Sequence, residues 1–382
     1  MGWKEETAMS NKEKFISEAL EENMTFVALC HKFGISRECG YKWLRRYRES
    51  GLKGLCELSR KPHICPIKTP INLENRILSI RDKHPAWGGR KIYAYLQQKG
   101  IKELPNPSTI TRILHRHNKI CEEQSLKHTA FKRFEHELPN QLWQMDFKGH
   151  FAIGSGRCHP LTILDDHSRY AISLKACANE QKTTVELKLI DIFREYGLPE
   201  RITMDNGTPW GTSTVEGYSA LEVWLILLGI KTSHSRPLHP QTQGKDERFH
   251  RTLKEELLNR KHFANLEVTQ EAFDEWKQCY NHERPHEACG MNPPASRYQV
   301  STRSYPEKIP LIEYETGSIV KRITRKGYLK FQGGVYYISQ TMARLPVKIT
   351  ESARIGIMEV YLKHQKIKEL DLINKIAAKK IV

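Results

Sequence analysis

Apolar residues recur every three or four positions through much of the first 120 residues, and every second position at several places beyond residue 140. The first spacing is typical of amphipathic helices and the second of strands. Residues 11–50 are predicted to form three helices, with Gly34 as a tight turn before the third and Ser36 as its N-cap. The third helix is rich in arginine and lysine. A short helix, a glycine turn and a basic helix form the helix-turn-helix pattern, so we predict such a DNA-binding domain over residues 1–60.

A second helical region follows a linker that contains three prolines. Its predicted helices begin at Ile71, after Gly88-Gly89, and at Ser108, which we expect to cap the third helix. We predict a second helix-turn-helix domain over residues 70–120 and a polar linker over residues 121–140. Two tandem domains would read a longer DNA site than one, because a single recognition helix covers only a few base pairs.

The apolar spacing changes to two at residue 141. Trp143, Met145 and Phe147 alternate with polar residues, which predicts a half-buried strand. Two more strands follow, and helices alternate with short strands after them. Gly197 is placed to end the first of these helices. This order predicts an α/β domain with a mixed five-stranded sheet over residues 141–300. Short strands with glycine turns then predict a small all-β barrel over residues 301–382.

Charge is unevenly distributed along the chain, whose formal net charge is +17. Residues 1–140 contain 26 Lys and Arg against 16 Asp and Glu, and residues 301–382 contain 16 against 7, whereas residues 141–300 contain 19 against 21. Basic ends around a near-neutral centre indicate two modules that bind a polyanion and flank a domain with another task. Nucleic acid is the expected polyanion. A membrane is not an expected partner, because the longest apolar stretch, at residues 220–230, is too short to span a bilayer.

Three acidic residues of the central domain stand where solubility alone would not place them. Asp146 lies in the first strand, opposite its apolar side chains, and Asp205 ends a short strand at the edge where α/β sheets bind ligands. Glu247 lies in the first turn of a helix, about 200° from Phe249 and among cations. Together these carboxylates would hold two Mg²⁺ ions, for which Mn²⁺ could substitute, with Asp146 as the bridging ligand.

Such a site would catalyse attack on a phosphodiester. One ion activates a water or a 3′-hydroxyl, and the other stabilises the leaving oxygen of an in-line displacement. Basic residues beside Glu247 would receive DNA phosphates at the rim of the site. The residues predicted to contact DNA are Lys245, Arg248, Arg251 and Lys254 in this helix, Arg37, Lys42, Arg45, Arg46 and Arg48 in the first helix-turn-helix domain, and Arg112 and Arg116 in the second.

Other residues have competing interpretations. Asp165 and Asp166 lie at a hairpin bend, where a structural role in the turn is expected. Asp246 points about 100° away from Glu247 and is expected to be a helix N-terminal charge. Three residues are open to either a role at the site or simple packing: His239, His250 and Trp210.

Four segments of the chain resemble the integrase core of bacterial insertion-sequence transposases, which are relatives of retroviral integrases. They are WQMDF, LTILDDHSRY, ITMDNGTPW and HPQTQGKDERFHRTLKEEL. Asp-Asn-Gly after a short strand and Gln-Gly-x-x-Glu at the start of a helix are the second and third acidic positions of that family. ISRECGYKWLRRYRESGLKGL resembles the helix-turn-helix leader of one such group. The resemblance implies an RNase H-like core, a DDE triad formed by Asp146, Asp205 and Glu247, and the terminal inverted repeats of a mobile element as substrate.

The chain departs from the family pattern in one respect. Between Asp205 and Glu247 lie 41 residues, somewhat more than in many relatives. The excess is expected in the loop GTSTVEGYSA, whose role is open.

We therefore expect a DNA transposase that binds element ends and target DNA, cuts and joins strands, and works as at least a dimer because two ends are joined. The expected location is the bacterial cytoplasm, in association with the nucleoid, since nine cysteines without a CxxC pair suit a reducing compartment. Two alternatives remain. One is a DNA-binding regulator with a catalytically silent core, and the other is a general nuclease of the same fold.

Overall fold

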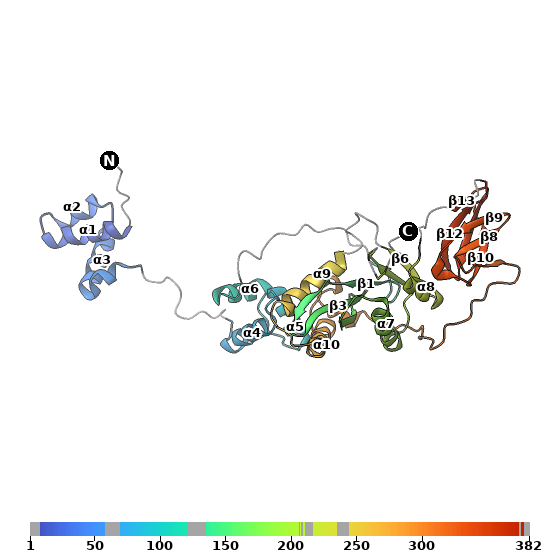
Figure 1. The fold of residues 1–382 in the computed structure, drawn as a ribbon. Coiled ribbons are helices and arrows are strands. Elements are labelled where there is room, and N and C mark those ends of the chain that lie inside the picture. The colour runs from blue at the N-terminus through green and yellow to red at the C-terminus, as the bar shows by residue number, and fades with distance from the viewer. Residues whose placement is uncertain are drawn as a thin grey trace. The chain divides into compact units, whose positions relative to one another are not determined.

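The computed structural model describes residues 8–57, 69–120, 135–205, 207, 209–210, 217–234, 244–373 and 376–377. The chain divides into two compact units, Met1–Lys68 and Thr69–Val382 (Figure 1). The predictions for most of the 121–140 linker, for His239 and for the start of the loop GTSTVEGYSA lie outside the described residues. No helix in the described ranges is both long and apolar enough to cross a bilayer.

The first unit is the predicted helical domain, with helices α1 (Ala8–Glu21), α2 (Phe26–Lys32) and α3 (Arg37–Ser50). Ser36 caps α3 as expected, because its hydroxyl accepts a hydrogen bond from the N–H of Cys39 at 3.2 Å. Gly40 allows α3 to pack closely, since a Cβ there would lie 2.7 Å from the sulfur of Cys30. A short 3-10 helix, η1 (Gly51–Leu55), follows α3. It belongs to the domain because Leu55 is fully buried in its core.

The second unit begins with three more helices, α4 (Ile71–Lys83), α5 (Gly89–Gln98) and α6 (Pro107–Arg116). The predicted N-cap of α6, Ser108, is wrong: the cap is Asn106 and Pro107 is the first helical residue. Proline suits that position because its φ is already helical and its missing N–H would have no partner there. The core of these helices also contacts Cys279 from the α/β domain, so this helical region is not separate from it.

The α/β domain contains the expected mixed sheet, in the order β2-β3-β1-β5-β6 with β4 paired to β3. It has six strands rather than five, because the three residues of β2 pair with the start of β3. β1 runs antiparallel to β3 and parallel to β5, and β5 runs parallel to β6. The strands are β1 (Trp143–Phe147), β2 (Phe151–Ile153), β3 (Gly156–Asp165), β4 (Ala171–Cys177), β5 (Arg201–Met204) and β6 (Lys231–His234).

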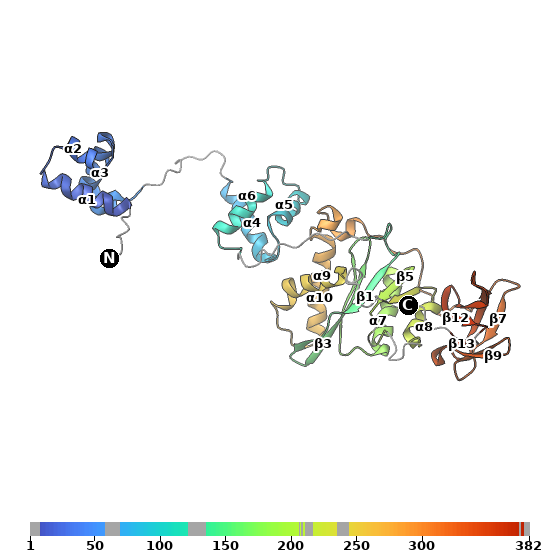
Figure 2. The same cartoon turned by 90° about the horizontal axis from the view of Figure 1, so that it is seen from above.

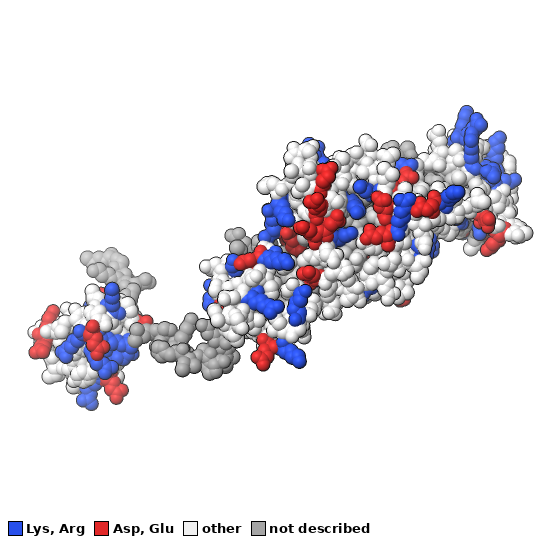
Figure 3. Space-filling view, turned by 90° about the horizontal axis from the view of Figure 1, so that it is seen from below, with Lys and Arg blue, Asp and Glu red and all other residues white. Residues whose placement is uncertain are grey.

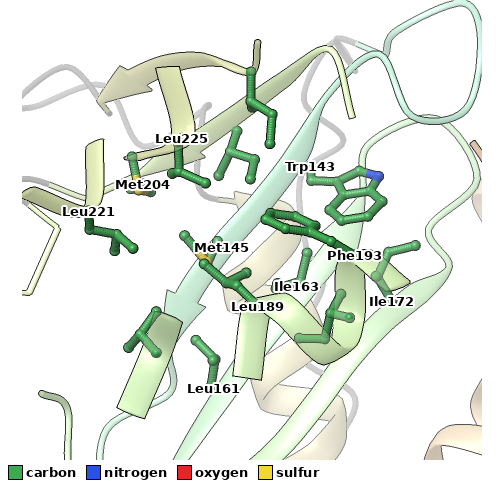
Figure 4. Packing of buried hydrophobic residues seen from close by; sticks show 14 of the residues in the cluster. Trp143, Met145, Leu161, Ile163, Ile172, Leu189, Phe193, Met204, Leu221 and Leu225 are labelled. Atoms are coloured by element: carbon green, nitrogen blue, oxygen red, sulfur yellow. The ribbon is translucent and has the colours of Figure 1, made fainter. Parts of the chain in front are cut away.

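Helices cover both faces of this sheet (Figures 1 and 2). One face packs against α7 (Lys182–Tyr196) and α8 (Ala220–Leu227), and Figure 4 shows Trp143 and Met145 of β1 among Leu189 and Phe193 of α7. The other face packs against α9 (Gly244–Leu253), the π-helical turn η3 (Lys254–Leu258) and α10 (Leu266–His282). The prediction that β1 is half-buried is therefore wrong, since Gln144 on its second face is buried as well. Gly197 ends α7 as predicted, with a φ of 72°.

The α/β domain makes hydrogen bonds to residues just outside 141–300 at both ends. Asn140, assigned to the linker, is buried and donates from its side chain to the carbonyl of Gln299 at 2.7 Å. Arg303, assigned to the next domain, donates to the carbonyl of Gly229 at 2.8 Å. The described residues of the second unit also contain three short 3-10 helices: η4 (Glu287–Cys289), η5 (Pro294–Ser296) and η6 (Gln340–Met342).

The C-terminal region is all-β as predicted, but its described strands do not form a closed barrel. They form a five-stranded sheet, in the order β13-β12-β11-β10-β7, and a separate hairpin of β8 and β9. Gln332 and Gly333, both with positive φ, make the tight turn of that hairpin. Both sheets contribute to one shared core instead of joining edge to edge. The strands are β7 (Ile319–Arg322), β8 (Tyr328–Phe331), β9 (Gly334–Tyr337), β10 (Pro346–Glu351), β11 (Ile357–Leu362), β12 (Gln365–Asp371) and β13 (Ile376–Ala377).

Candidate active site

The first two predicted acids lie on neighbouring strands. In the parallel ladder of β1 and β5, Trp143 is paired with Ile202, and continuing this register places Asp146 beside Asp205. Apolar neighbours of both aspartates point into the core under α7 and α8. Because side chains alternate along a strand, the two carboxylates lie on the opposite face, the one that α9 covers. The fold therefore brings Asp146 and Asp205 together, as the sequence predicted.

The environment of these aspartates disfavours two negative charges. Burial raises the pKa of Asp146 to about 7, and the charge of Asp205 acts in the same direction. Burial also raises the pKa of Asp205, although the N–H of Gly207 donates to its Oδ1 at 3.0 Å and the charge of His234 opposes the shift. The charge of Glu180 raises the pKa of both groups. A divalent cation would relieve this repulsion, since carboxylate oxygens are the ligands that Mg²⁺ prefers.

The third predicted acid is not assembled with the other two. Glu247 lies in the first turn of α9 and its side chain is exposed. Among the described residues, no group of three or more His, Cys, Asp and Glu side chains is arranged to hold a metal ion.

Asp246 occupies the interior position that Glu247 does not. It is 5% exposed, and the pKa of its carboxyl is raised well above the ordinary value by burial, then by the charges of Asp146 and Asp166. Asp246 lies in the first turn of α9, where a helix N-terminal charge was expected, but its side chain is buried there. Its spacing gave the signal, because Asp246 precedes the buried Phe249 by three positions and so shares the apolar face of the helix.

A hydrogen-bond chain connects α9 to β1 beneath the aspartates. The hydroxyl of Thr162 donates to the backbone carbonyl of Asp146 at 2.9 Å, and its oxygen lies 2.8 Å from Nε2 of His250. Burial, followed by the charge of Lys148, lowers the pKa of His250 to about 4, so its ring is neutral at pH 7. Because the hydroxyl hydrogen is already used, Nε2 must carry the hydrogen that Thr162 accepts. Thr162 was missed by the sequence reasoning, although it stands opposite Asp146 in the ladder between β1 and β3.

The rival acids at the hairpin bend have structural roles. Asp165 accepts hydrogen bonds from the N–H of Asn140 and from the N–H and hydroxyl of Ser168, as expected for a turn. Asp166 accepts from the side-chain amide of Gln144 at 3.0 Å and from the ammonium of Lys245. Lys245, which was predicted to contact DNA phosphate, is therefore turned toward a buried carboxylate and forms an ion pair with it.

Most of the other predicted DNA-binding side chains are exposed, and on the face in Figure 3 basic side chains are visible over both units. Four of them have partners within the protein: Lys42 and Arg46 at the ring of Trp43, Arg116 at Glu74 and Arg248 at Glu287. The guanidinium of Arg46 lies over the ring of Trp43, 5.1 Å from its centroid, and Arg116 is 2.6 Å from the buried Glu74. Trp210 is 1% exposed and stacks on Phe147, so packing and not base stacking explains it. The exposed members are Arg37, Lys42, Arg45, Arg48, Arg112, Arg116, Arg248, Arg251 and Lys254.

Comparison with protein families agrees with this architecture. Two models described as integrase core domain match residues 136–240 and 228–294. A homeodomain-like domain matches residues 39–114, and a helix-turn-helix domain matches residues 11–63.

Several relatives among known proteins come from insertion elements or transposons. The insertion element IS476 39.2 kDa protein of Xanthomonas euvesicatoria is 27% identical over 60% of this chain and 66% of its own length, just under two thirds. The transposase for insertion sequence element IS904 of Lactococcus lactis is 23% identical over 62% of this chain and 97% of its own length. The transposase for transposon Tn552 of Staphylococcus aureus is 25% identical over 65% of this chain and 60% of its own length.

Among solved structures, the HTLV-2 integrase catalytic core domain in complex with magnesium is 17% identical, with a TM-score of 0.33, over 43% of this chain and 99% of that one. The chain therefore contains an integrase core domain and helix-turn-helix domains, and it is similar to the transposases of insertion sequences and transposons.

Proposed function

We propose that this chain binds the terminal inverted repeats of an insertion sequence and cleaves and joins DNA strands at Asp146 and Asp205, with Glu247 as the third acid. The observation that supports the proposal is the parallel register of β1 and β5, which brings Asp146 beside Asp205 when it is continued past Gln144 and Thr203. Exposed basic residues of α3 and α9 supply the DNA contacts that such a reaction needs.

The two aspartates suit Mg²⁺ and would hold it jointly. When bound, the ions would activate the attacking hydroxyl and stabilise the leaving oxygen. Asp146 and Asp205 would lose the protons that their raised pKa values favour, and Arg248, Arg251 and Lys254 would hold the phosphates of the strand.

Glu247 needs a change in α9 to join them. Consecutive residues of a helix are about 100° apart, so a rotation of this size in its first turn would exchange Asp246 for Glu247. The burial of Asp246 near Asp146 favours a second candidate, in which Asp246 is itself the third ligand. Substituting each residue separately distinguishes the two.

The test of the function uses purified protein with DNA that carries the sequences flanking the reading frame. A duplex of shuffled sequence is the matched control. We expect end-specific binding, Mg²⁺- or Mn²⁺-dependent nicking and strand joining, and loss of nicking but not of binding in Asp146→Asn. Equal digestion of the shuffled duplex would instead identify a general nuclease. Binding without nicking by the unaltered chain would identify a silent regulator.

The proposed reaction also has consequences for the oligomeric state of the chain and for its location in the cell. Because transposition joins two ends, we infer at least two copies of the chain on a pair of ends, acting at the bacterial nucleoid. The mass of the complex with end DNA, measured by light scattering, tests this: one copy per pair of ends would contradict it.

A further inference from the structure

Two buried polar side chains meet on the side of the sheet away from the acidic site. Nε2 of His234, in the last position of β6, lies 2.8 Å from Oε1 of Glu222 in α8. The side chain of Glu222 is 0% exposed and that of His234 is 7% exposed. Burying such a polar pair costs desolvation free energy, so we expect the pair to have a specific role.

His234 connects this pair to Asp205. Its Nδ1 lies 2.7 Å from the backbone carbonyl oxygen of Asp205. A carbonyl only accepts, so Nδ1 donates the hydrogen. Asp205 follows the last residue of β5, and the ladder between β5 and β6 ends with the pair Met204 and His234. The imidazole therefore continues the hydrogen bonding of the sheet past the end of the ladder and holds the peptide of Asp205.

Glu222 has little freedom to move. It forms a capping box at the start of α8, in which its Oε2 accepts from the N–H of Ser219 at 2.6 Å and its own N–H donates to the hydroxyl of Ser219 at 3.1 Å. One carboxylate oxygen is thus fixed to the helix terminus and the other faces His234. The capping box sets the position of the imidazole as well as the start of the helix.

α8 is held from two sides. Leu221 and Leu225 belong to the core under the sheet, whereas Val223 and Ile226 belong to the core of the C-terminal sheets. The ammonium of Lys363, from the turn between β11 and β12, donates to the carbonyl of Leu227 at 2.8 Å. The C-terminal region therefore fixes the helix that carries Glu222.

We propose that Glu222 and His234 are positioning residues for Asp205. They hold its backbone so that the carboxylate on the opposite face is correctly oriented for a divalent cation, and they contact neither cation nor DNA. The inference rests on the proposed role of Asp205 as a metal ligand. A purely structural pair would stabilise the fold without affecting the cation.

The decisive comparison is between Glu222→Gln and Glu222→Gln/His234→Leu. In the single variant the new amide side chain can still accept from Ser219 and can donate to the imidazole, so the bond to Asp205 is kept. In the double variant that bond is lost, yet no charge is left buried without a partner. The two variants thus differ in the group that touches the carbonyl of Asp205.

A matched pair elsewhere serves as the control. Nε2 of His117 lies 2.6 Å from Oε1 of the buried Glu74 in the helical region at 70–120. Glu74→Gln and Glu74→Gln/His117→Leu repeat the same chemical changes far from Asp205 in sequence. They measure what the loss of another histidine contact to a buried glutamate does to the full chain.

Two readouts are required, both on the full chain. One is Mg²⁺ binding without DNA, measured by calorimetry, and the other is the nicking rate as a function of Mg²⁺ concentration. Loss of the His234 bond should weaken Mg²⁺ binding about 10- to 100-fold relative to Glu222→Gln, as is usual for groups that orient a ligand. Raised Mg²⁺ should restore part of the nicking rate, and the control pair should show no such difference.

The proposal is overturned if both Glu222 variants bind Mg²⁺ equally, or if the control pair loses Mg²⁺ affinity to the same extent. The variant Asp205→Asn distinguishes failure of the proposed function from failure of the positioning role. If Asp205→Asn itself nicks DNA at the unaltered rate, the proposed function fails. If it is inactive while the His234 bond has no effect on Mg²⁺, only the positioning role fails.

Discussion

Nε2 of His250 lies 2.8 Å from the hydroxyl oxygen of Thr162 in β3, and that hydroxyl donates to the carbonyl of Asp146 in β1, so α9 is attached to both strands. The helix contributes the candidate third acid, so its position against β1 decides whether that acid reaches the site. A neutral imidazole is needed for this contact to form without a buried charge.

Replacing His250 by glutamine should remove part of the acid sensitivity of the fold. The pKa of His250 is lowered to about 4 in the folded chain, whereas an unfolded histidine titrates near ~6.5. Between these values the unfolded state binds more protons, so the free energy of unfolding falls as the pH falls, by up to about 1.4 kcal/mol per pH unit. Glutamine cannot bind that proton and its amide can still donate to Thr162. Urea unfolding from pH 8 to pH 4 measures the difference.

His115→Gln is the control for this experiment, because His115 is exposed on α6. It should follow the unaltered chain at every pH. Parallel curves for His250→Gln and the unaltered chain would show that His250 is not held neutral in the fold.

Binding of Mg²⁺ should depend on pH through Asp146. Its raised pKa, about 7, means that the carboxyl is protonated below that value and must release a proton to bind the cation. Mg²⁺ affinity should therefore fall as the pH is lowered from 8 to 6, approaching a tenfold loss per pH unit below 7. Asp205→Asn removes one cause of the raised pKa, so it should move the midpoint to lower pH while weakening binding. Calorimetry at pH 6, 7 and 8 in two buffers gives the affinity and the protons released; an affinity independent of pH would contradict the assignment.

The third acid can be identified by two isosteric substitutions. If Glu247 moves in to bind the cation, Glu247→Gln should reduce nicking by at least about a hundredfold, on the order of the roughly 2.7 kcal/mol or more that a lost transition-state contact removes. Asp246→Asn should then preserve nicking and raise the melting temperature, because it removes a buried carboxyl that lies near Asp146 and Asp166. Nicking rates and melting curves of the two variants decide the matter. The opposite pattern, with Asp246→Asn inactive and Glu247→Gln active, would assign the role to Asp246.

Arg45 and Arg46 are adjacent in α3 but should behave differently. Arg45 is exposed, so Arg45→Ala should weaken binding to end DNA and reduce the slope of log K against log salt by about 0.9, the value for one phosphate contact. Arg46 lies over Trp43, and its substitution should chiefly lower the stability of the first domain. Fluorescence anisotropy between 50 and 300 mM salt, with urea unfolding of the same samples, separates the two effects. An unchanged slope for Arg45→Ala would remove it from the DNA interface.

The helices and strands could be predicted from the sequence because neighbouring residues determine them. The spacing of apolar residues gave the helices and strands, and Ser36 and Gly197 gave two of their ends. The pairing of Asp146 with Asp205 was also accessible, because both lie near the same edge of a sheet whose parallel strands could be inferred. The number of strands in the α/β sheet and the open form of the C-terminal sheets could not be predicted, because both depend on which strand edges pair.

Side chains that pair over long sequence separations were the main source of error. Lys245 meets Asp166 across 79 positions, and a basic residue in an amphipathic helix gives no indication of so distant a partner. The burial of Asp246 follows from how α9 docks on the sheet. Its spacing from Phe249 hinted at this, whereas the usual preference for acids at helix N-termini, which Asp246 follows, gave no sign of burial.

Arg116 should prove to be a structural residue with little part in DNA binding. It donates to Oε1 of Glu74 at 2.6 Å, and Glu74 is only 4% exposed, so removing the guanidinium leaves a buried carboxylate that still has His117 at 2.6 Å. Arg116→Ala should lower the free energy of unfolding by about 1 kcal/mol, a modest value because more than half of the arginine side chain is exposed. Arg112→Ala, on the exposed face of the same helix, should instead weaken DNA binding without changing stability. Urea unfolding and anisotropy on both variants provide the comparison; a larger loss of DNA affinity in Arg116→Ala than in Arg112→Ala, at unchanged stability, would return Arg116 to the DNA interface.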